Sequence, residues 1–374
     1  MASPLLGARL TAFGRRRMLY SGLTTLAIST AAFAFVVDVR APYTYVFMSV
    51  FLRMVQGFGA ACTQTASYSL TAALFPDRLS LYLGMSETVT GLGFMIGPPL
   101  GGWFFMFGGF RAPFVVMGLL PLAVMGVLHR FMPPDARVST GVGGQGDEGA
   151  PGGLRALRLV TRRSGVMVVA GICVAANSAY AFLEPTLEPA FGTRDHVNEG
   201  VIGLLFFTVS LTYTATAPAA GLAADARRHG ARKVMLCGVT LLALAFLAMG
   251  PSPLLGARQP PKALWFLVGS LAAAGVGQSM ALVPTMDAMV QNVADLGDDG
   301  VNIVSGIINS ANSLGEMLGP LLGSLLYQHV GWQWATTVWA AALLALLGAE
   351  MAFHAYTNGH LALPTARHKA TWGA

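Results

Sequence analysis

The sequence predicts an all-α membrane protein with about ten transmembrane helices, arranged as two bundles of four and six helices. Three observations predict this class: few charged residues, ten long apolar segments and an internal repeat. Only 11% of the 374 residues are charged and 54% are hydrophobic, whereas soluble domains carry about 25% charged residues. Because so few charges cannot cover so much apolar surface in water, the composition excludes a soluble enzyme and a disordered regulator.

Ten segments are long and apolar enough for spanning helices, which need about 20 such residues. They cover residues 17–37, 44–72, 79–106, 112–132, 165–190, 200–224, 233–250, 263–290, 301–327 and 333–353. Residues 133–164 are rich in Gly, Pro and Arg, as in a flexible linker. We therefore expect an incomplete N-terminal bundle of four helices (1–132), this linker, and a C-terminal six-helix bundle with a short tail (165–374).

The basic residues predict how the helices are oriented. Loops on one side of the predicted bundle hold 17 of the 23 Lys and Arg residues, and loops on the other side hold five. Since cytoplasmic loops carry the excess of Lys and Arg, both termini and the 133–164 linker are predicted to be cytoplasmic. Basic residues spread over short loops do not form a nucleic-acid-binding face. The sequence leaves open which membrane the protein occupies: vesicle, other endomembrane or plasma membrane.

Two stretches of the first half recur in the second half. GMSETVTGLGFMIGPPLGG, from Gly84, matches GIINSANSLGEMLGPLLGS, from Gly306, and GARLTAFGRRR, from Gly7, matches GLAADARRHGARK, from Gly221. The first match aligns two Gly-Pro pairs: Gly97 and Pro98 with Gly319 and Pro320. Parallel repeats on either side of a cytoplasmic linker are typical of transporters built from two halves.

These motifs resemble the major facilitator superfamily, and the resemblance covers nearly the whole chain. GLAADARRHGARK is similar to the family's cytoplasmic loop motif, FLRMVQGFGAA to its fourth-helix pattern, and GLGFMIGPPLGG to the fifth-helix motif of proton-coupled exporters. The resemblance implies gating roles for Arg53, Asp225, Arg232, Gly97, Pro98, Gly319 and Pro320. Asp225 in particular is predicted to dock at the N-terminus of the 79–106 helix, whose dipole attracts an anion.

Within this family, LGMSETVTGLGFMIGPPLGG and AFLEPTLEPAF resemble the vesicular amine transporters, especially the polyamine type. The ten spans then match family helices three to twelve. We therefore expect two further spans encoded upstream of Met1, and poor transport by the 374-residue chain alone. Thr11 stands where the loop motif has an acidic residue. Monoamine members carry acidic residues where this chain has Gln291 and Asn309, which leaves a polyamine, another organic cation or a drug-like cation as candidate substrates.

Polar residues inside the spans predict a cavity between the two halves. An ionised residue at the bilayer centre costs about 2.5–3.5 kcal/mol, so it faces a cavity or a partner. The acidic candidates are Glu87, Glu184, Glu188, Asp287 and Glu316, and five carboxyls against the single Arg53 favour a cation. Helical spacing gives three polar faces: Asn177, Tyr180, Glu184 and Glu188; Asn309, Asn312 and Glu316; and Asp287 and Gln291.

We therefore predict a secondary active transporter that exchanges protons for an organic cation of the amine or polyamine type by alternating access. A proton and the cation would compete for one carboxyl, and Glu184 is the main candidate. A multidrug-type proton antiporter and a truncated, non-transporting membrane protein stay open as alternatives. The sequence holds no H-E-x-x-H pair, no G-x-S-x-G elbow and no cysteine pair with metal-ligand spacing, so we expect no enzyme activity, metal or cofactor. The expected partners are the substrate, protons and lipid, with the chain as a monomer.

Overall fold

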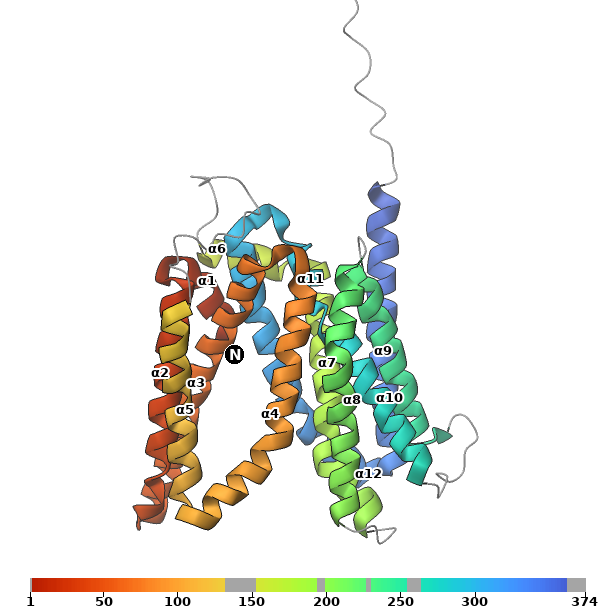
Figure 1. Cartoon of the computed structure of the whole chain (residues 1–374). Coiled ribbons are helices and arrows are strands. Elements are labelled where there is room, and N and C mark those ends of the chain that lie inside the picture. The colour runs from red at the N-terminus through yellow and green to blue at the C-terminus, as the bar shows by residue number, and fades with distance from the viewer. Residues whose placement is uncertain (1, 132–152, 194–198, 227–229, 254–263, 362–374) are drawn as a thin grey trace, which may run out of the picture.

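The computed structural model describes residues 2–131, 153–193, 199–226, 230–253 and 264–361, and the elements within these ranges are helices (Figure 1). The first half consists of α1 (Ser3–Phe13), α2 (Arg15–Phe33), α3 (Pro42–Leu74), α4 (Leu79–Gly108) and α5 (Arg111–Phe131), with short 3₁₀ turns at Val36–Asp38 and Pro76–Arg78. Prolines in the first turn favour the starts of α1 and α3. Gly14 and Gly109, both with positive φ, end α1 and α4.

The second half consists of α6 (Gly153–Thr161), α7 (Ser164–Leu187) with the π-helical turn η4 (Glu188–Thr193), α8 (Glu199–Asp225), α9 (Gly230–Met249), α10 (Leu264–Leu282), α11 (Thr285–Val290), a 3₁₀ turn (Ala294–Leu296) and α12 (Gly297–Leu361). The predicted 263–290 span is divided at Pro284 into α10 and α11. The last two predicted spans both lie in α12, which Gly331 interrupts with a φ of +74°. Within the described residues, which leave out 132 and 263, each of the ten predicted segments therefore coincides with helical structure.

Among the described residues, eight stretches are long and apolar enough to cross a membrane. One of them, Ala294–Ala352, contains the interruption at Gly331. Pro76–Gly97 and Pro99–Gly108, which together contain α4, pass the same test as a pair bent by 42°. The all-α membrane class predicted from the sequence is therefore confirmed.

The end of the predicted linker differs from the expectation. Residues 153–161 form helix α6, and the side chains of Ala156 and Val160 are fully buried where α6 packs against α1 and α12. These two residues are four positions apart, so they lie on one helix face and bury it, which explains why this stretch is ordered. The rest of the linker, from 133 to 152, lies outside the described residues.

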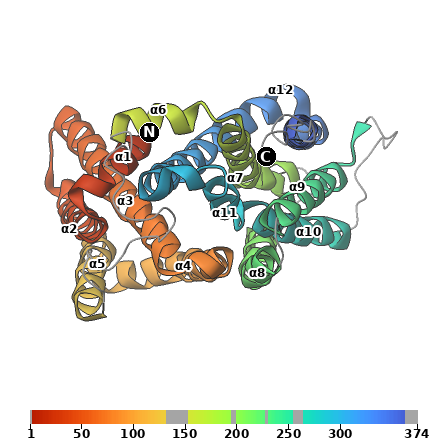
Figure 2. The same ribbon diagram turned by 90° about the horizontal axis from the view of Figure 1, so that it is seen from above.

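The helices form two groups. Seen from above, α2, α3 and α5 lie on one side and α7 to α10 on the other, with α4 beside α8 (Figure 2). The groups meet along two helix pairs, α4 with α8 and α1 with α12. We call the end of the bundle where α1, α6 and α11 lie, at the top of Figure 1, the α6 end.

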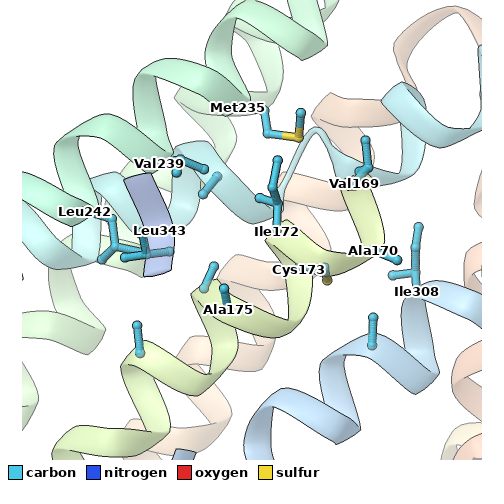
Figure 3. Packing of buried hydrophobic residues seen from close by; sticks show 14 of the residues in the cluster. Val169, Ala170, Ile172, Cys173, Ala175, Met235, Val239, Leu242, Ile308 and Leu343 are labelled. Atoms are coloured by element: carbon cyan, nitrogen blue, oxygen red, sulfur yellow. The ribbon is translucent and has the colours of Figure 1, made fainter. Parts of the chain in front are cut away.

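The largest cluster of buried apolar residues is in the second half, around α7. Figure 3 shows Ile172 of α7 close to Met235 and Val239 of α9, and all three side chains are fully buried. The cluster of the first half is smaller and joins α1, α2 and α3 through Leu10, Leu23 and Cys62. Helix α7 is therefore held in place by close apolar packing against α9.

Candidate functional site

A cavity of about 990 Å³ lies between α3 and α4 of the first half and α7, α8, α10 and α12 of the second half. This volume is at the upper end of the range for sites that enclose a drug-sized molecule. The aromatic residues that line it are Tyr68, Tyr180, Phe206, Phe207 and Tyr213, and the main polar ones are Gln64, Glu87, Asn177, Glu184, Ser210, Gln278, Asn312 and Glu316. The lining thus combines aromatic rings with hydrogen-bonding and acidic groups.

The charge of the cavity comes from three carboxyl groups on three helices. Glu87 lies on α4, Glu184 on α7 and Glu316 on α12, and the residues found to line the cavity include no Lys, Arg or His. Glu316 is within electrostatic range of both Glu184 and Glu87. Carboxylates without a compensating base attract a cation, and aromatic faces add cation–π attraction.

The three carboxyl groups have different surroundings. Tyr213 of α8 donates a hydrogen bond to Oε2 of Glu87 at 2.9 Å, which ties α4 to α8. Glu184 is exposed to the cavity, and among the described residues no side chain forms a hydrogen bond or ion pair with it. Its neighbour Tyr180 is engaged with Ser210, with the two hydroxyl oxygens 3.2 Å apart. Glu316 is likewise exposed and has no hydrogen-bond or ion-pair partner among the described residues. Glu184 and Glu316 are therefore the two carboxyls most available to a ligand.

A group of amides joins α7, α12 and α3 on one wall of the cavity. Asn177 Nδ2 donates to Oδ1 of Asn312 at 2.9 Å, and the Cys173 thiol donates to the same oxygen at 2.8 Å. Asn312 Nδ2 in turn donates to the Tyr68 hydroxyl at 3.3 Å. Since Tyr68 belongs to the first half, this network connects the two halves beside the acidic groups.

Six of the ten predicted binding residues line the cavity: Asn177, Tyr180, Glu184, Glu87, Asn312 and Glu316. The other four, Glu188, Asp287, Gln291 and Asn309, are not among the lining residues. Glu188 begins the π-helical turn η4, where the wider winding ends the face that Glu184 occupies.

Asp287 and Gln291 pair with each other instead of lining the cavity. Helix α11 contributes Thr285 and Met286 to the lining, whereas Gln291 Nε2 donates to Asp287 Oδ2 at 3.1 Å. Asn309 is buried and donates to Ser3 Oγ of α1 at 2.9 Å. It is three residues before Asn312, an interval that rotates it about 60° around the helix, and it lies at the contact with α1.

The predicted docking of Asp225 is confirmed. The backbone N–H groups of Ser80 and Leu81, in the first turn of α4, donate to its two carboxylate oxygens at 3.2 and 2.8 Å. Because the N-terminal N–H groups of a helix have no partner within it, a carboxylate is favoured there. Asp225 thereby joins α8 to α4 at the α6 end.

The other predicted gating residues lie in several places. Arg232 forms an ion pair with the buried Glu350 of α12. Arg53 donates to Gln56 at 2.9 Å, and its guanidinium lies 4.2 Å from the centre of the Phe33 ring, so it is not paired with Glu184. Gly97 and Pro98 coincide with the bend of α4. Gly319 packs against α7, while Pro320 continues α12.

Sequence reasoning missed several lining residues, among them Gln64, Tyr68, Ser210 and Tyr213. A signal was present, because Gln64 and Tyr68 are four residues apart and Ser210 and Tyr213 three apart, each pair on one face of an apolar span. Neutral polar pairs at helical spacing in an apolar span therefore indicate a cavity lining, as acidic residues do.

Close contacts between the halves gather at the α6 end. A methyl group added at Gly84 of α4 would lie 2.4 Å from the carbonyl oxygen of Ala217 in α8. One added at Gly306 of α12 would lie 2.2 Å from the carbonyl oxygen of Ser3 in α1. Farther along α4 the bend carries the helix toward α5 (Figure 1). The halves thus touch closely at the α6 end, with glycine required at both crossings.

The family is shown by comparison with known proteins. The model of the Major Facilitator Superfamily matches residues 1–194 and again residues 166–370, so the chain belongs to this superfamily of multi-pass membrane transporters. The two successive matches agree with the internal repeat.

The chain is also similar to individual transporters and to solved structures of this superfamily. The chain is 28% identical over 342 residues to the MFS-type transporter SLC18B1 of Homo sapiens, covering 90% of this chain and 72% of that protein. It is 24% identical over 358 residues to the synaptic vesicular amine transporter of Bos taurus, covering 94% of this chain and 63% of that protein. The fold resembles the crystal structure of the human organic anion transporter MFSD10 (TETRAN), with a TM-score of 0.66, 24% identity and coverage of 93% of this chain and 80% of that one.

Proposed function

We propose that the protein exchanges protons for an organic cation of the amine or polyamine type by alternating access, as a monomer with its α6 end and its C-terminus in the cytoplasm. The expected cytoplasmic N-terminus does not fit the structure, because Ser3 is buried against α12 and the described chain begins midway along the bundle (Figure 1). The observation that carries this proposal is the cavity with three carboxyl groups, aromatic walls and no basic residue among those found to line it. The similarity to a vesicular amine transporter supports the same substrate class.

In this proposal Glu184 binds the cation and the proton alternately. Its carboxylate faces the cavity without a partner among the described residues, whereas Glu87 is held by Tyr213. Glu316 is equally free of partners, and Glu184 is preferred because it shares a helix face with Asn177 and Tyr180, which also line the cavity. A bound proton removes the negative charge that attracts the cation, so the two ligands exclude each other at this group. Glu316, within electrostatic range of Glu184, strengthens the attraction for a cation that carries more than one charge.

Alternating access then requires the two halves to separate at the α6 end and approach each other at the opposite end. The close contacts at Gly84 and Gly306 are those that must part. Beyond the α6 end, methyl groups added at Gly97 and Gly101 of α4 would meet no described atom within 4 Å, so this part of α4 is not yet in close contact with the second half.

The test compares Glu184→Gln with Glu188→Gln in the purified chain. Glu188 lies one turn farther along and outside the cavity lining, which makes it a matched control. Spermidine binding, followed by thermal stabilisation, should weaken at least tenfold in Glu184→Gln, because removing one charge partner costs about 2–5 kcal/mol. It should also weaken as pH falls in the unchanged protein and in Glu188→Gln. If Glu184→Gln binds and exchanges spermidine at the native rate and pH dependence, Glu184 is not the coupling site.

A multidrug-type antiporter is the second candidate, favoured by the apolar part of the cavity wall, which includes Met95, Phe206, Phe207 and Met286. Tetraphenylphosphonium, a bulky cation without N–H donors, distinguishes the two functions. A multidrug protein should bind it as well as it binds spermidine, whereas an amine transporter should prefer spermidine. A substrate-induced pH change in proteoliposomes would exclude the non-transporting alternative.

The proposed orientation of the protein in the membrane can be tested separately. A cysteine at Arg158, an exposed residue of α6, should react only with reagents that reach the cytoplasmic face. Modification from the outside of intact cells would contradict the proposed topology.

A further inference from the structure

The segments that follow Gly7 and Gly221 pack against equivalent parts of α12 and α4. A methyl group added at Gly7 would lie 2.4 Å from the carbonyl oxygen of Asn302, and one added at Gly221 would lie 2.4 Å from that of Ser80. Asn302 and Ser80 are themselves equivalent in the repeat that contains Gly306 and Gly84. The two interfaces between the halves therefore share one backbone geometry, and their side chains can be compared position by position.

The fourth residue after each glycine differs between the two copies. In the second copy it is Asp225, whose carboxylate accepts the N–H groups at the start of α4. In the first copy it is Thr11, whose hydroxyl donates to Asp299 in the first turn of α12 and accepts from Asn302 Nδ2 at 2.9 Å. Asp299 is equivalent to Asp77 of the second copy, but Asp77 is exposed and takes no part in the Asp225 contact. The acid that makes the contact therefore comes from the helix side in the first copy and from the loop side in the second.

Arg15 completes the first copy at a position where the second copy has Ala231. Its side chain is only 8% exposed, and its Nη2 lies 3.3 Å from Oδ1 of Asp298 in α12. Its Nε donates to Ser69 Oγ of α3 at 2.8 Å and to Asn302 Oδ1 at 3.2 Å. A largely buried guanidinium of the first half is thus bonded to a carboxylate and an amide of the second half.

We propose that Thr11, Arg15, Asp298, Asp299 and Asn302 form a second latch that holds the α6 end closed, with the charges exchanged between the two sides relative to the Asp225 contact. The acids of α12 lie at its N-terminus, where the helix dipole stabilises them. Arg15 supplies the opposite charge from the first half. Opening the α6 end must break the ion pair between Arg15 and Asp298 and the hydrogen bonds that Thr11 and Arg15 form with α12, so the latch favours the closed state.

The exchange of charges makes an unusual prediction for Thr11. Thr11→Asp copies the residue of the Asp225 contact, yet it should weaken the latch, because the new carboxylate would face Asp299 at hydrogen-bonding distance. Adding Asp299→Asn should restore closure, since the Asn amide can donate to the new carboxylate. A simple loss of packing at position 11 would not be repaired by the second change.

The experiment measures closure directly, in the full chain in proteoliposomes. A reporter cysteine replaces Ser3, which is 2% exposed at the crossing with Gly306, in a Cys237→Ser background. Its alkylation by a thiol reagent supplied at the α6 end should be slow, and Asp298→Asn and Thr11→Asp should each accelerate it roughly tenfold. Thr11→Asp with Asp299→Asn and the charge-conserving Asp298→Glu should both remain slow.

Asp295→Asn is the matched control. Asp295 is an acid of the same region, but it pairs with Arg163, which lies beside α7 in the same half. Its replacement should leave alkylation unchanged. Unchanged alkylation in Asp298→Asn, or slower alkylation in Thr11→Asp, would overturn the latch. The latch matters for function only if the protein transports as proposed. Its test measures closure and not transport, so a failed substrate test would not affect the result.

Discussion

The two halves carry the same repeated glycines but use them differently. In α12, a methyl group added at Gly319 would lie 2.6 Å from the Cβ of Ala181 and 2.6 Å from the carbonyl oxygen of Ser178, both in α7. At the equivalent Gly97 of α4 it would meet no atom of the described structure within 4 Å. The same motif thus provides a close helix crossing in one half and a bend in the other. A glycine determines how near a neighbour can come, but the fold determines whether a neighbour is there.

The repeated loop motif shows the same contrast between the halves. Arg232 pairs with Glu350, whose side chain is 3% exposed. Its equivalent, the half-buried Arg16, contacts His129 Nδ1 at 3.1 Å in an exposed contact and lies over the Tyr20 ring. One copy of the motif therefore contains a buried charge pair, and the other contains a surface contact.

The largest effect is expected when the buried pair between Arg232 and Glu350 is broken. Arg232→Met leaves the Glu350 carboxylate buried without its partner, which should lower the free energy of unfolding by about 3–5 kcal/mol. Arg16→Met, the equivalent change at an exposed contact, should cost about 1 kcal/mol or less. Thermal unfolding of the detergent-solubilised protein measures both. Equal losses in the two variants would contradict the comparison.

The next effect concerns the glycine crossing. Gly319→Ala should lower the unfolding free energy by about 1–3 kcal/mol, because the added methyl forces α7 and α12 apart. Gly97→Ala meets open space and should change it by no more than about 0.5 kcal/mol in either direction. The same thermal measurement applies. A larger loss at Gly97 than at Gly319 would show that the open face of α4 is closely packed in the membrane.

The smallest effect concerns the Asp225 contact. Asp225→Asn removes the charge at the start of α4 but retains one oxygen that can accept an N–H, so the closed state should lose only about 1 kcal/mol. A reporter cysteine at Ser80, which is fully buried, should then be alkylated several times faster from the α6 end. Asp77→Asn, an exposed acid three residues earlier, is the control and should not change the rate. Unchanged alkylation in Asp225→Asn would mean that this contact does not hold the halves together.

Local sequence patterns were sufficient for much of the fold and part of the site. Helix-length apolar runs located the helices of all ten predicted segments, since a segment that crosses a bilayer must satisfy its backbone hydrogen bonds internally. Helical spacing placed Asn177, Tyr180 and Glu184 on one face, and the cavity receives all three. The contact of Asp225 with the start of α4 could also be predicted, because the N-terminus of any helix attracts an anion.

Only the tertiary structure decided which helix faces meet. Asn309 and Asn312 are both amides in one span, yet one contacts α1 and the other faces the cavity. The exchange of charges around Thr11 and the burial of Glu350 likewise depend on residues hundreds of positions apart or on different helices. The sequence by itself determined where the helices lie, which of them repeat and which carry acidic residues, because these features follow from composition, apolar segment length and helical spacing. The rotation of each helix about its axis, and the partner it meets, depend on the packing of the whole bundle.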